Sequence, residues 1–133
     1  MTQPIALSAD VPSANAVDAL YGTGHWLYSQ QRTAHAVAVF RAMIHLAPHD
    51  ERGWLALGAC HEADDQVDIA LQLYSTASSI ATAPRCELAK ARILRARGMS
   101  EEARRAVAEA SRIAEELRDE DLCKLVAAER VRL

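Results

Sequence analysis

The sequence predicts an all-α fold made of short helices in a repeating arrangement, and three observations support this. Half of the 133 residues are apolar but only 5% are aromatic, and five glycines and four prolines are few for a loop-rich fold. Alanine, leucine, arginine and glutamate, which favour helices, supply much of the remainder. From Asn15 onward, apolar residues recur at helical spacing, and small residues recur every 33 or 34 positions. We expect a single domain with one core.

The first residues are not expected to be helical. Residues 1–13 contain Pro4 and Pro12 among small and polar side chains, so we expect a mobile tail or exchangeable arm at 1–14 and a folded domain at 15–133. The start lacks the basic residues and long apolar run of a secretory signal. No segment reaches the ~20 apolar residues that a membrane helix needs. We therefore expect a cytoplasmic protein with no stable membrane insertion.

Helical spacing then marks out the elements in order. We expect helices at residues 15–30, 33–47, 51–64, 67–81, 85–97 and 100–117, with a further helix from 119 toward the C-terminus. Each helix has only three or four turns, and such short helices need neighbours that bury their apolar faces.

Turn residues separate the first four helices. Pro48 ends the second helix because proline cannot continue one. Asp64 and Asp65 lie in the turn after the third helix, and with Asp68 they are expected to cap the fourth.

Similar signals separate the later helices. Pro84 is expected to interrupt the chain before the fifth helix begins at Arg85, and Gly98 can supply a left-handed cap after it. Ser100 is expected to cap the sixth helix, because a serine oxygen can accept from free amides and the carboxylates that follow suit the positive helix end.

Small and large apolar residues recur at equivalent places in three helix pairs. The equivalent sets are Gly24, Gly58 and Ala91; Ala36, Ala70 and Ala103; Phe40, Tyr74 and Val107; and Met43, Ala77 and Ala110. This pattern resembles the tetratricopeptide repeat, a helix pair of about 34 residues. The resemblance implies repeats at about 17–50, 51–83 and 84–116, a capping helix at 119–131, and a short right-handed solenoid whose first helices line the concave face. The alternative is a plain alanine-rich helical bundle.

The stretch from Leu20 to Ser78 resembles one branch of that superfamily, the class II chaperones of bacterial type III secretion. The matching segments are Leu20-Tyr21-Gly22, Tyr28, Ala36-Val37-Ala38-Val39-Phe40-Arg41-Ala42, Leu57-Gly58-Ala59-Cys60 and Asp68-Ile69-Ala70-Leu71-Gln72-Leu73-Tyr74-Ser75. The resemblance implies a cytoplasmic chaperone that keeps a secreted translocator-like client soluble before export by holding an extended segment near its N-terminus. Members of the branch dimerise through a longer N-terminal extension, so a homodimer is left open here.

Positions three or four apart share a helix face and predict the client-binding residues independently. On the first helix of each pair these are Tyr21, His25, Tyr28 and Ser29; Arg52, Leu55, Ala59 and Glu62; and Arg85, Leu88, Arg92 and Arg95. Tyrosine and leucine would form apolar pockets, and the arginines could bond main-chain carbonyls or acidic side chains.

Six of these residues also have an ordinary structural interpretation. Tyr21 could pack under the N-terminal tail, and Leu55 and Leu88 could be buried against a neighbouring helix. The arginines of the third unit could form a solvated basic face.

Other chemistries find little support. The net charge of −3 and pI of about 5.9 argue against nucleic-acid binding, which relies on clustered lysine and arginine. His45 and His49 have metal-pair spacing, but Pro48 lies between them, and adjacent Cys60 and His61 point in different directions on a helix. Nucleotide-binding and nucleophile motifs are missing from the sequence. We expect no enzymatic activity, no metal and no cofactor; the alternative function is a general tetratricopeptide adaptor that assembles a regulatory complex.

Overall fold

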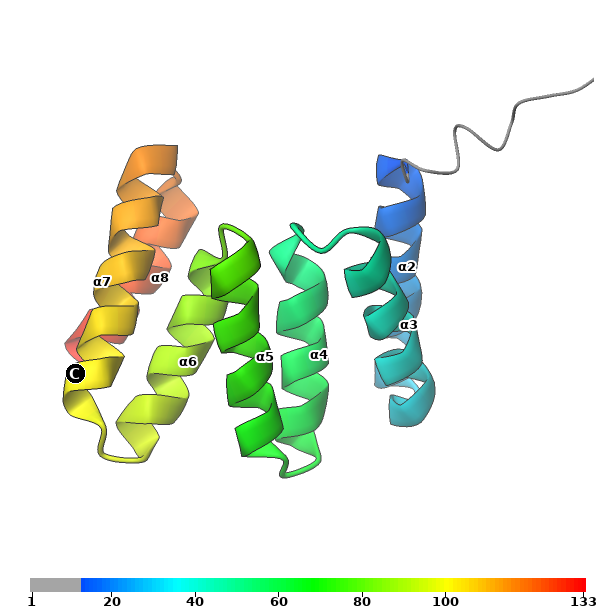
Figure 1. Cartoon of the computed structure of the whole chain (residues 1–133), viewed down its shortest axis with the longest axis horizontal. Coiled ribbons are helices and arrows are strands. Elements are labelled where there is room, and N and C mark those ends of the chain that lie inside the picture. Colours follow the sequence, from blue (N-terminus) through cyan, green and yellow to red (C-terminus); the bar gives the residue numbers. More distant parts are fainter. Residues whose placement is uncertain (1–12) are drawn as a thin grey trace, which may run out of the picture.

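In the computed structural model, which describes residues 13–133, every regular element is a helix. The seven helices of this part are α2 (Ala14–Ser29), α3 (Thr33–Leu46), α4 (Glu51–Ala63), α5 (Val67–Ile80), α6 (Pro84–Ala96), α7 (Ser100–Leu117) and α8 (Glu120–Val131). They stand side by side in chain order, and the turns that join them lie alternately at the lower and the upper edge of the row (Figure 1). The all-helical prediction is confirmed, and the observed helix ends lie within one or two residues of those expected.

The expected N-terminal tail falls mostly outside the described residues. The structure begins at Ser13, whose side chain caps α2 by accepting from the amide of Ala16 at 3.1 Å. Ala14 is already helical, so α2 begins one residue before the position expected.

Three of the expected helix starts differ in detail. Pro84 is the first residue of α6, where its missing N–H is no loss. Ser100 is likewise inside α7, which begins without a side-chain cap. Asp68 does not cap α5 and instead forms an ion pair with Arg97 at 2.6 Å. Gly98 has φ of +77°, as a left-handed cap requires, so the prediction for this residue is confirmed.

Glycine-aromatic contacts hold the first two helix pairs together. A methyl group added at Gly24 would collide with the Phe40 ring, and one added at Gly58 would collide with the Tyr74 ring. Both rings are fully buried. The third pair uses Ala91 and a smaller partner, Val107, in one buried cluster. The sequence correctly predicts that small residues on one helix admit large ones from the next.

The stack is tighter along one side than along the other. Helices α2, α4, α6 and α8 approach one another in succession, with Cα atoms within 8 Å, whereas no Cα atoms of α3, α5 and α7, all within the described range, come that close to one another. We call the surface formed by α2, α4, α6 and α8 the inner face.

Candidate peptide-binding face

Two of the expected residues on α2 lie together at one end of the inner face. The Tyr21 ring is half-buried, 4.5 Å from the His25 ring in an edge-to-face arrangement and 6.5 Å from the Phe40 ring. The guanidinium of Arg52 lies 4.9 Å from the centre of the same ring, so α4 also holds it. Tyr21 therefore packs within the fold and also presents part of its ring to solvent.

Tyr28 and Ser29 have different surroundings. Both are exposed at the end of α2, where they line an open cavity of about 750 Å³ with residues of α3 and α4 that include Val37 and Cys60. The cavity does not reach Leu55 or Ala59. Tyr28 and Ser29 are therefore not part of one continuous surface with the predicted binding residues of α4. The spacing of residues within α2 could not predict this separation, because it does not show which part of α4 lies beside the end of α2.

The α4 residues alternate between packed and free positions. Leu55 is half-buried against the core cluster shared by α4, α5 and α6, as its structural interpretation requires. Ala59, one turn further on, is exposed. It is the predicted α4 position that offers room for a ligand without disturbing the core.

Arg52 links α2 to α4. It forms ion pairs with Asp18 at 2.9 Å and with Asp50 at 2.8 Å. The hydrogen bonds from Arg52 hold the pKa of Asp50 below its usual value, although partial burial opposes the shift.

Glu62 occupies the other end of the α4 face. It accepts two hydrogen bonds from Arg92, each of 2.8 Å, and one of 2.6 Å from the Tyr74 hydroxyl. Burial alone would raise the pKa of Glu62, but the bonds from Arg92 and Tyr74 and the charge of Arg92 together hold it below its usual value. The carboxylate is thus part of the internal structure.

The three arginines of α6, and Arg97 directly after it, are paired with carboxylates of other helices or turns. The pairs are Arg85 with Glu51 and Asp119, Arg92 with Glu62, Arg95 with Glu129, and Arg97 with Asp68. A solvated basic face is therefore the wrong interpretation for Arg85, Arg92 and Arg95. Leu88, on the same face, is half-buried against the cluster that contains Leu122 and Val126 of α8.

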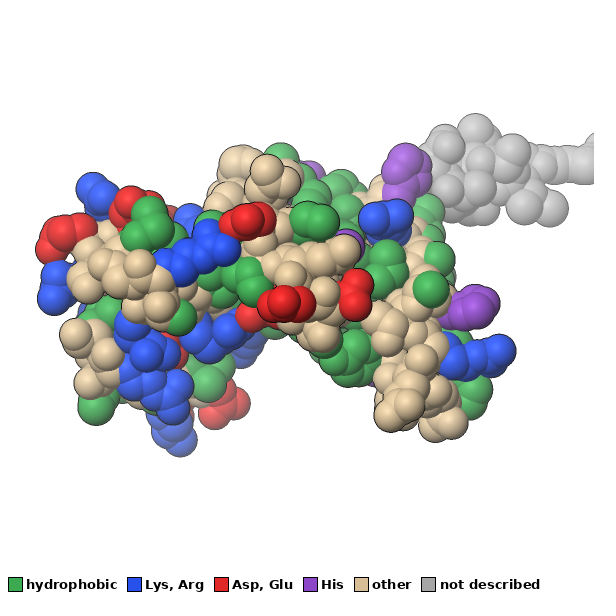
Figure 2. Space-filling model, turned by 90° about the horizontal axis from the view of Figure 1, so that it is seen from below, with side chains coloured by type: hydrophobic (Ala, Val, Ile, Leu, Met, Phe, Trp, Pro, Cys, Tyr) green, Lys and Arg blue, Asp and Glu red, His purple; other side chains and the backbone are tan. Residues whose placement is uncertain are grey.

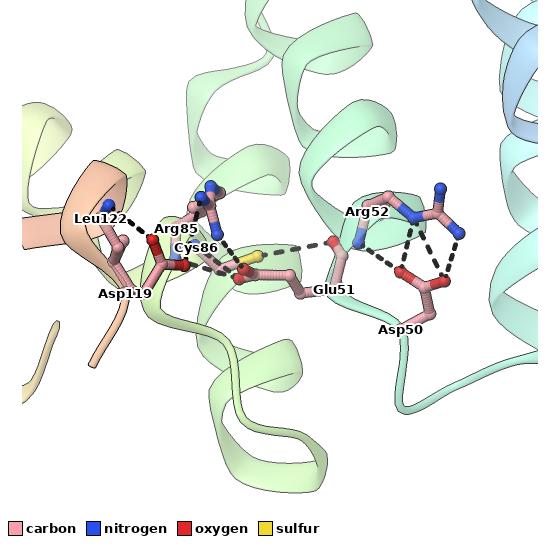
Figure 3. Close-up of polar contacts among 7 residues, drawn as sticks. All are labelled: Asp50, Glu51, Arg52, Arg85, Cys86, Asp119 and Leu122. Atoms are coloured by element: carbon pink, nitrogen blue, oxygen red, sulfur yellow. Dashed lines mark hydrogen bonds and ion pairs between the residues drawn. The ribbon is translucent and has the colours of Figure 1, made fainter. Parts of the chain in front are cut away.

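The starts of alternate helices are connected through side chains (Figure 3). Asp50 caps α4, and Asp119 caps α8 by accepting from the Leu122 amide at 3.0 Å. Helix α6 has no side-chain cap of its own. Instead, Glu51 of α4 accepts from the amides of Arg85 at 3.0 Å and Cys86 at 3.3 Å.

Burial raises the pKa of the Glu51 carboxyl, and the bonds from α6 only partly offset this. The carboxylates Asp18, Glu51, Asp119 and Glu129 were not among the predicted site residues. The repeat period carries a signal for three of them, because Asp18 and Arg52, Glu51 and Arg85, and Arg85 and Asp119 are each 34 positions apart.

Charge is unevenly distributed along the molecule. On the side seen in Figure 2, acidic and basic side chains crowd over the end built from α6 to α8. The end built from α2 and α3 shows mainly apolar and uncharged side chains. Between Ala14 and Leu46 the charged residues are Asp18, Arg32 and Arg41.

Within residues 13–133, no three His, Cys, Asp or Glu side chains come close enough to hold a metal ion together. In the same part of the chain, no helix is both long enough and apolar enough to cross a membrane. Cys60 and Cys86 are buried, and burial raises the pKa of both thiols.

Comparison with known proteins gives matches among solved structures. No protein-family model matches the chain, and no curated protein matches it in sequence. The fold is similar to the type III secretion translocator chaperone SycD of Yersinia enterocolitica, with 25% identity, a TM-score of 0.77 and all of both chains covered. It is also similar to PcrH of Pseudomonas aeruginosa, with 26% identity, a TM-score of 0.72, and 89% of this chain and 91% of PcrH covered.

A type III secretion complex of Aeromonas hydrophila contains a third similar chain. That match has 27% identity, a TM-score of 0.74, and covers 98% of this chain and 86% of the other. The resemblance to translocator chaperones with a tetratricopeptide-like fold is confirmed.

Proposed function

We propose that this chain is a cytoplasmic type III secretion chaperone that binds a translocator-like client and keeps it soluble before export. The observation that carries the proposal is its similarity, over nearly the whole chain, to chaperones that have been solved with such ligands. SycD has been solved with a peptide of the translocator YopD, and PcrH with the chaperone-binding regions of PopB and of PopD. Binding is stoichiometric and requires no catalysis, metal, cofactor or nucleic acid.

The proposal includes a finer view of the fold. The pairs α2–α3, α4–α5 and α6–α7 are three tetratricopeptide-like units at about 17–50, 51–83 and 84–116, and α8 is the cap within 119–131. The glycine-aromatic contacts inside the first two pairs support this division. The tighter packing along the inner face supports a solenoid that curves toward that side.

The client segment would lie extended along this inner face. Tyr21, His25 and Ala59 offer exposed surface, and the half-buried Leu55 and Leu88 would form the floors of shallow apolar pockets. Because Arg52, Glu62, Arg92 and Arg95 are already paired, we propose that they shape the face and bond the client at their exposed edges. Tyr28 and Ser29 would meet a client that extends past the end of α2.

A homodimer is compatible with this proposal, since SycD has been solved in an alternative dimeric form. The inner face described above belongs to one chain, so client binding does not require a second copy.

Co-expression with the candidate translocator tests the proposal. The client should become soluble and co-purify with this chain. Ala59→Arg should abolish co-purification while preserving helicity and unfolding temperature, because Ala59 is exposed on the inner face. Gln72→Arg places the same charge at an exposed position of α5, outside the inner face, and is the matched control.

Two results would contradict the proposal. One is a client that stays insoluble beside the wild-type chain, and the other is equal binding by the Ala59→Arg and Gln72→Arg variants. Recovery of a stable cytosolic complex without a secreted client would instead favour the adaptor function.

A further inference from the structure

Helix α8 lies at the end of the stack away from α2, and one stripe along it is exposed in the described part of the chain (Figure 1). We call it the α8 stripe and define it by Asp121, Leu125, Ala128 and Arg132. These residues follow one another at intervals of four, three and four positions, so they share one face of the helix. Arg132 directly follows the last residue of α8 and keeps right-handed helical backbone angles, so the stripe continues to it.

The middle of the α8 stripe is apolar. Leu125 is 48% exposed, whereas Leu122 and Val126 of the same helix are buried in a cluster with residues of α6 and α7. Val131, one turn after Ala128, is 87% exposed. The end units of a repeat stack normally present a polar surface to water. Exposed leucine and valine at this end of the stack therefore favour a partner that covers them.

The two ends of the α8 stripe carry opposite charges. Asp121 lies in the first turn of α8. Arg132 lies just beyond its last turn and forms an ion pair at 3.7 Å with Glu129, but its side chain is still 60% exposed. Both charges are therefore accessible to a partner that lies along the stripe.

The order of these residues is complementary to itself when it is read in the opposite direction. The midpoint between Asp121 and Arg132 along the helix coincides with the midpoint between Leu125 and Ala128. A two-fold axis through that point therefore places Asp121 beside the partner's Arg132, and Leu125 beside the partner's Ala128. Every contact then occurs twice, as in other two-fold interfaces. The small side chain of Ala128 leaves room for the leucine.

We propose that the α8 stripe is an interface between two copies of this chain, whose α8 helices pack antiparallel. The macrodipoles of the two helices then also oppose each other. Each α8 has 12 residues and is about 18 Å long, so the contact is smaller than the roughly 800 Å² per partner of a standard interface. The dimer is therefore weak, with a dissociation constant in the micromolar range.

An extended client segment is the competing occupant of the α8 stripe. A client would require no self-complementary order of charged and apolar residues, so the observed order favours a second copy. None of the predicted client-binding residues lies on α8. The inference therefore does not depend on the proposed function, and either one can fail without the other.

Sedimentation equilibrium of the full-length chain, over a wide range of concentrations, tests the inference. The wild-type chain should show a monomer–dimer equilibrium. Asp121→Arg and Arg132→Asp should each weaken association by about tenfold or more, because each brings like charges together across the two-fold axis. The variant with both substitutions should recover most of the association, because the exchanged charges are again opposite.

The double variant distinguishes an interface from a stabilised helix. Asp121 and Arg132 also suit the macrodipole of α8, so each reversal alone disfavours the helix and the two together disfavour it more. Thermal unfolding of dilute, monomeric protein measures that effect separately. Recovery of association in the double variant, despite a lower unfolding temperature, is the result expected of an interface.

Leu125→Asp should abolish the dimer, because it places a charge in the apolar middle of the stripe in both copies. Ile69→Asp is the matched control, since Ile69 is 40% exposed on α5, and it should leave association unchanged. A wild-type chain that is monomeric at every concentration would overturn the proposal. So would a dimer that persists in the Leu125→Asp variant, or a double charge reversal that associates no better than the single ones.

Discussion

At the scale of single residues, the fold depends on where a side chain is missing. Gly58 admits the buried Tyr74 ring, and Gly22 faces open space on another helix of the same stack. Both glycines have a helical backbone conformation and differ in what surrounds them, so their alanine substitutions can be compared directly.

Gly58→Ala should destabilise the protein, and Gly22→Ala should stabilise it. Overpacking against a buried ring costs about 1–3 kcal/mol, and we expect the upper part of that range even after alanine's helix preference of roughly 1 kcal/mol. Gly22→Ala should gain roughly 0.5–1 kcal/mol, because nothing opposes the better helix former. Urea unfolding of both variants measures the difference, and changes of the same sign would contradict the packing assigned to Gly58.

Residue types that act through local geometry could be predicted from the sequence. The glycine and alanine positions, the large partners and Gly98 follow from periodicity and backbone preference alone. Ser100 and Asp68 could not be placed as reliably, because a cap depends on whether the helix starts one residue earlier or later. The structure uses Asp68 to pair with Arg97, which is 29 positions away.

At the scale of helices, α6 depends on a neighbour for its start. Glu51 of α4 accepts from two free amides of α6, which lacks its own capping side chain. The same carboxyl group is an ion-pair partner of Arg85, at 3.6 Å. The unit formed by α4 and α5 is therefore joined to α6 by hydrogen bonds as well as by apolar packing.

Glu51→Ala should destabilise the protein by about 1–2 kcal/mol, the usual effect of losing a helix cap. Glu51→Gln should recover most of that loss, because its amide oxygen still accepts from α6 and no charge remains buried. Thermal unfolding compares the two, and hydrogen exchange at residues 85–90 should accelerate in the alanine variant only. If the glutamine variant is as unstable as the alanine variant, then the ion pair with Arg85 outweighs the cap.

The order and the ends of the helices could be predicted from the sequence, but the partners of the side chains on each helix face could not. The spacing of Arg85, Leu88, Arg92 and Arg95 correctly places them on one face of α6. Their partners come from α4 and α8, and only the stacking of the units brings those helices together. The sequence therefore indicates a candidate face without showing that its charges are already paired.

At the scale of the whole molecule, ion pairs across the inner face couple stability to pH. The pKa values of Asp50 and Glu62 are lowered in the folded state, so each ionised carboxylate stabilises the fold above its unfolded-state pKa. That stabilisation is lost as the pH falls through the lowered pKa. Glu51 acts in the opposite direction because its pKa is raised, so the stability it contributes is present at low pH and is lost as the pH rises through the raised value.

Wild-type stability should therefore decrease as the pH falls from about 5 to about 3, since the ordinary pKa of the carboxyl group is 3.8 for aspartate and 4.5 for glutamate. Glu62→Gln should reduce stability near neutral pH by about 1 kcal/mol, a modest value because Arg92 is nearly half exposed and screened by water. The difference between wild type and variant should then vanish in acid, where Glu62 is protonated. Urea unfolding at a series of pH values measures this convergence.

Glu109→Gln is the control, because it removes an exposed ion pair that does not connect two helices. Glu109 pairs with Arg112 within α7. Its pKa is also lowered by Arg112, but the pair lies in water, which screens the interaction. We expect this variant to follow the wild-type pH curve closely. A constant difference between wild type and Glu62→Gln at every pH would show that the glutamate acts through packing, and would remove the ion pair between α4 and α6 as a source of acid sensitivity.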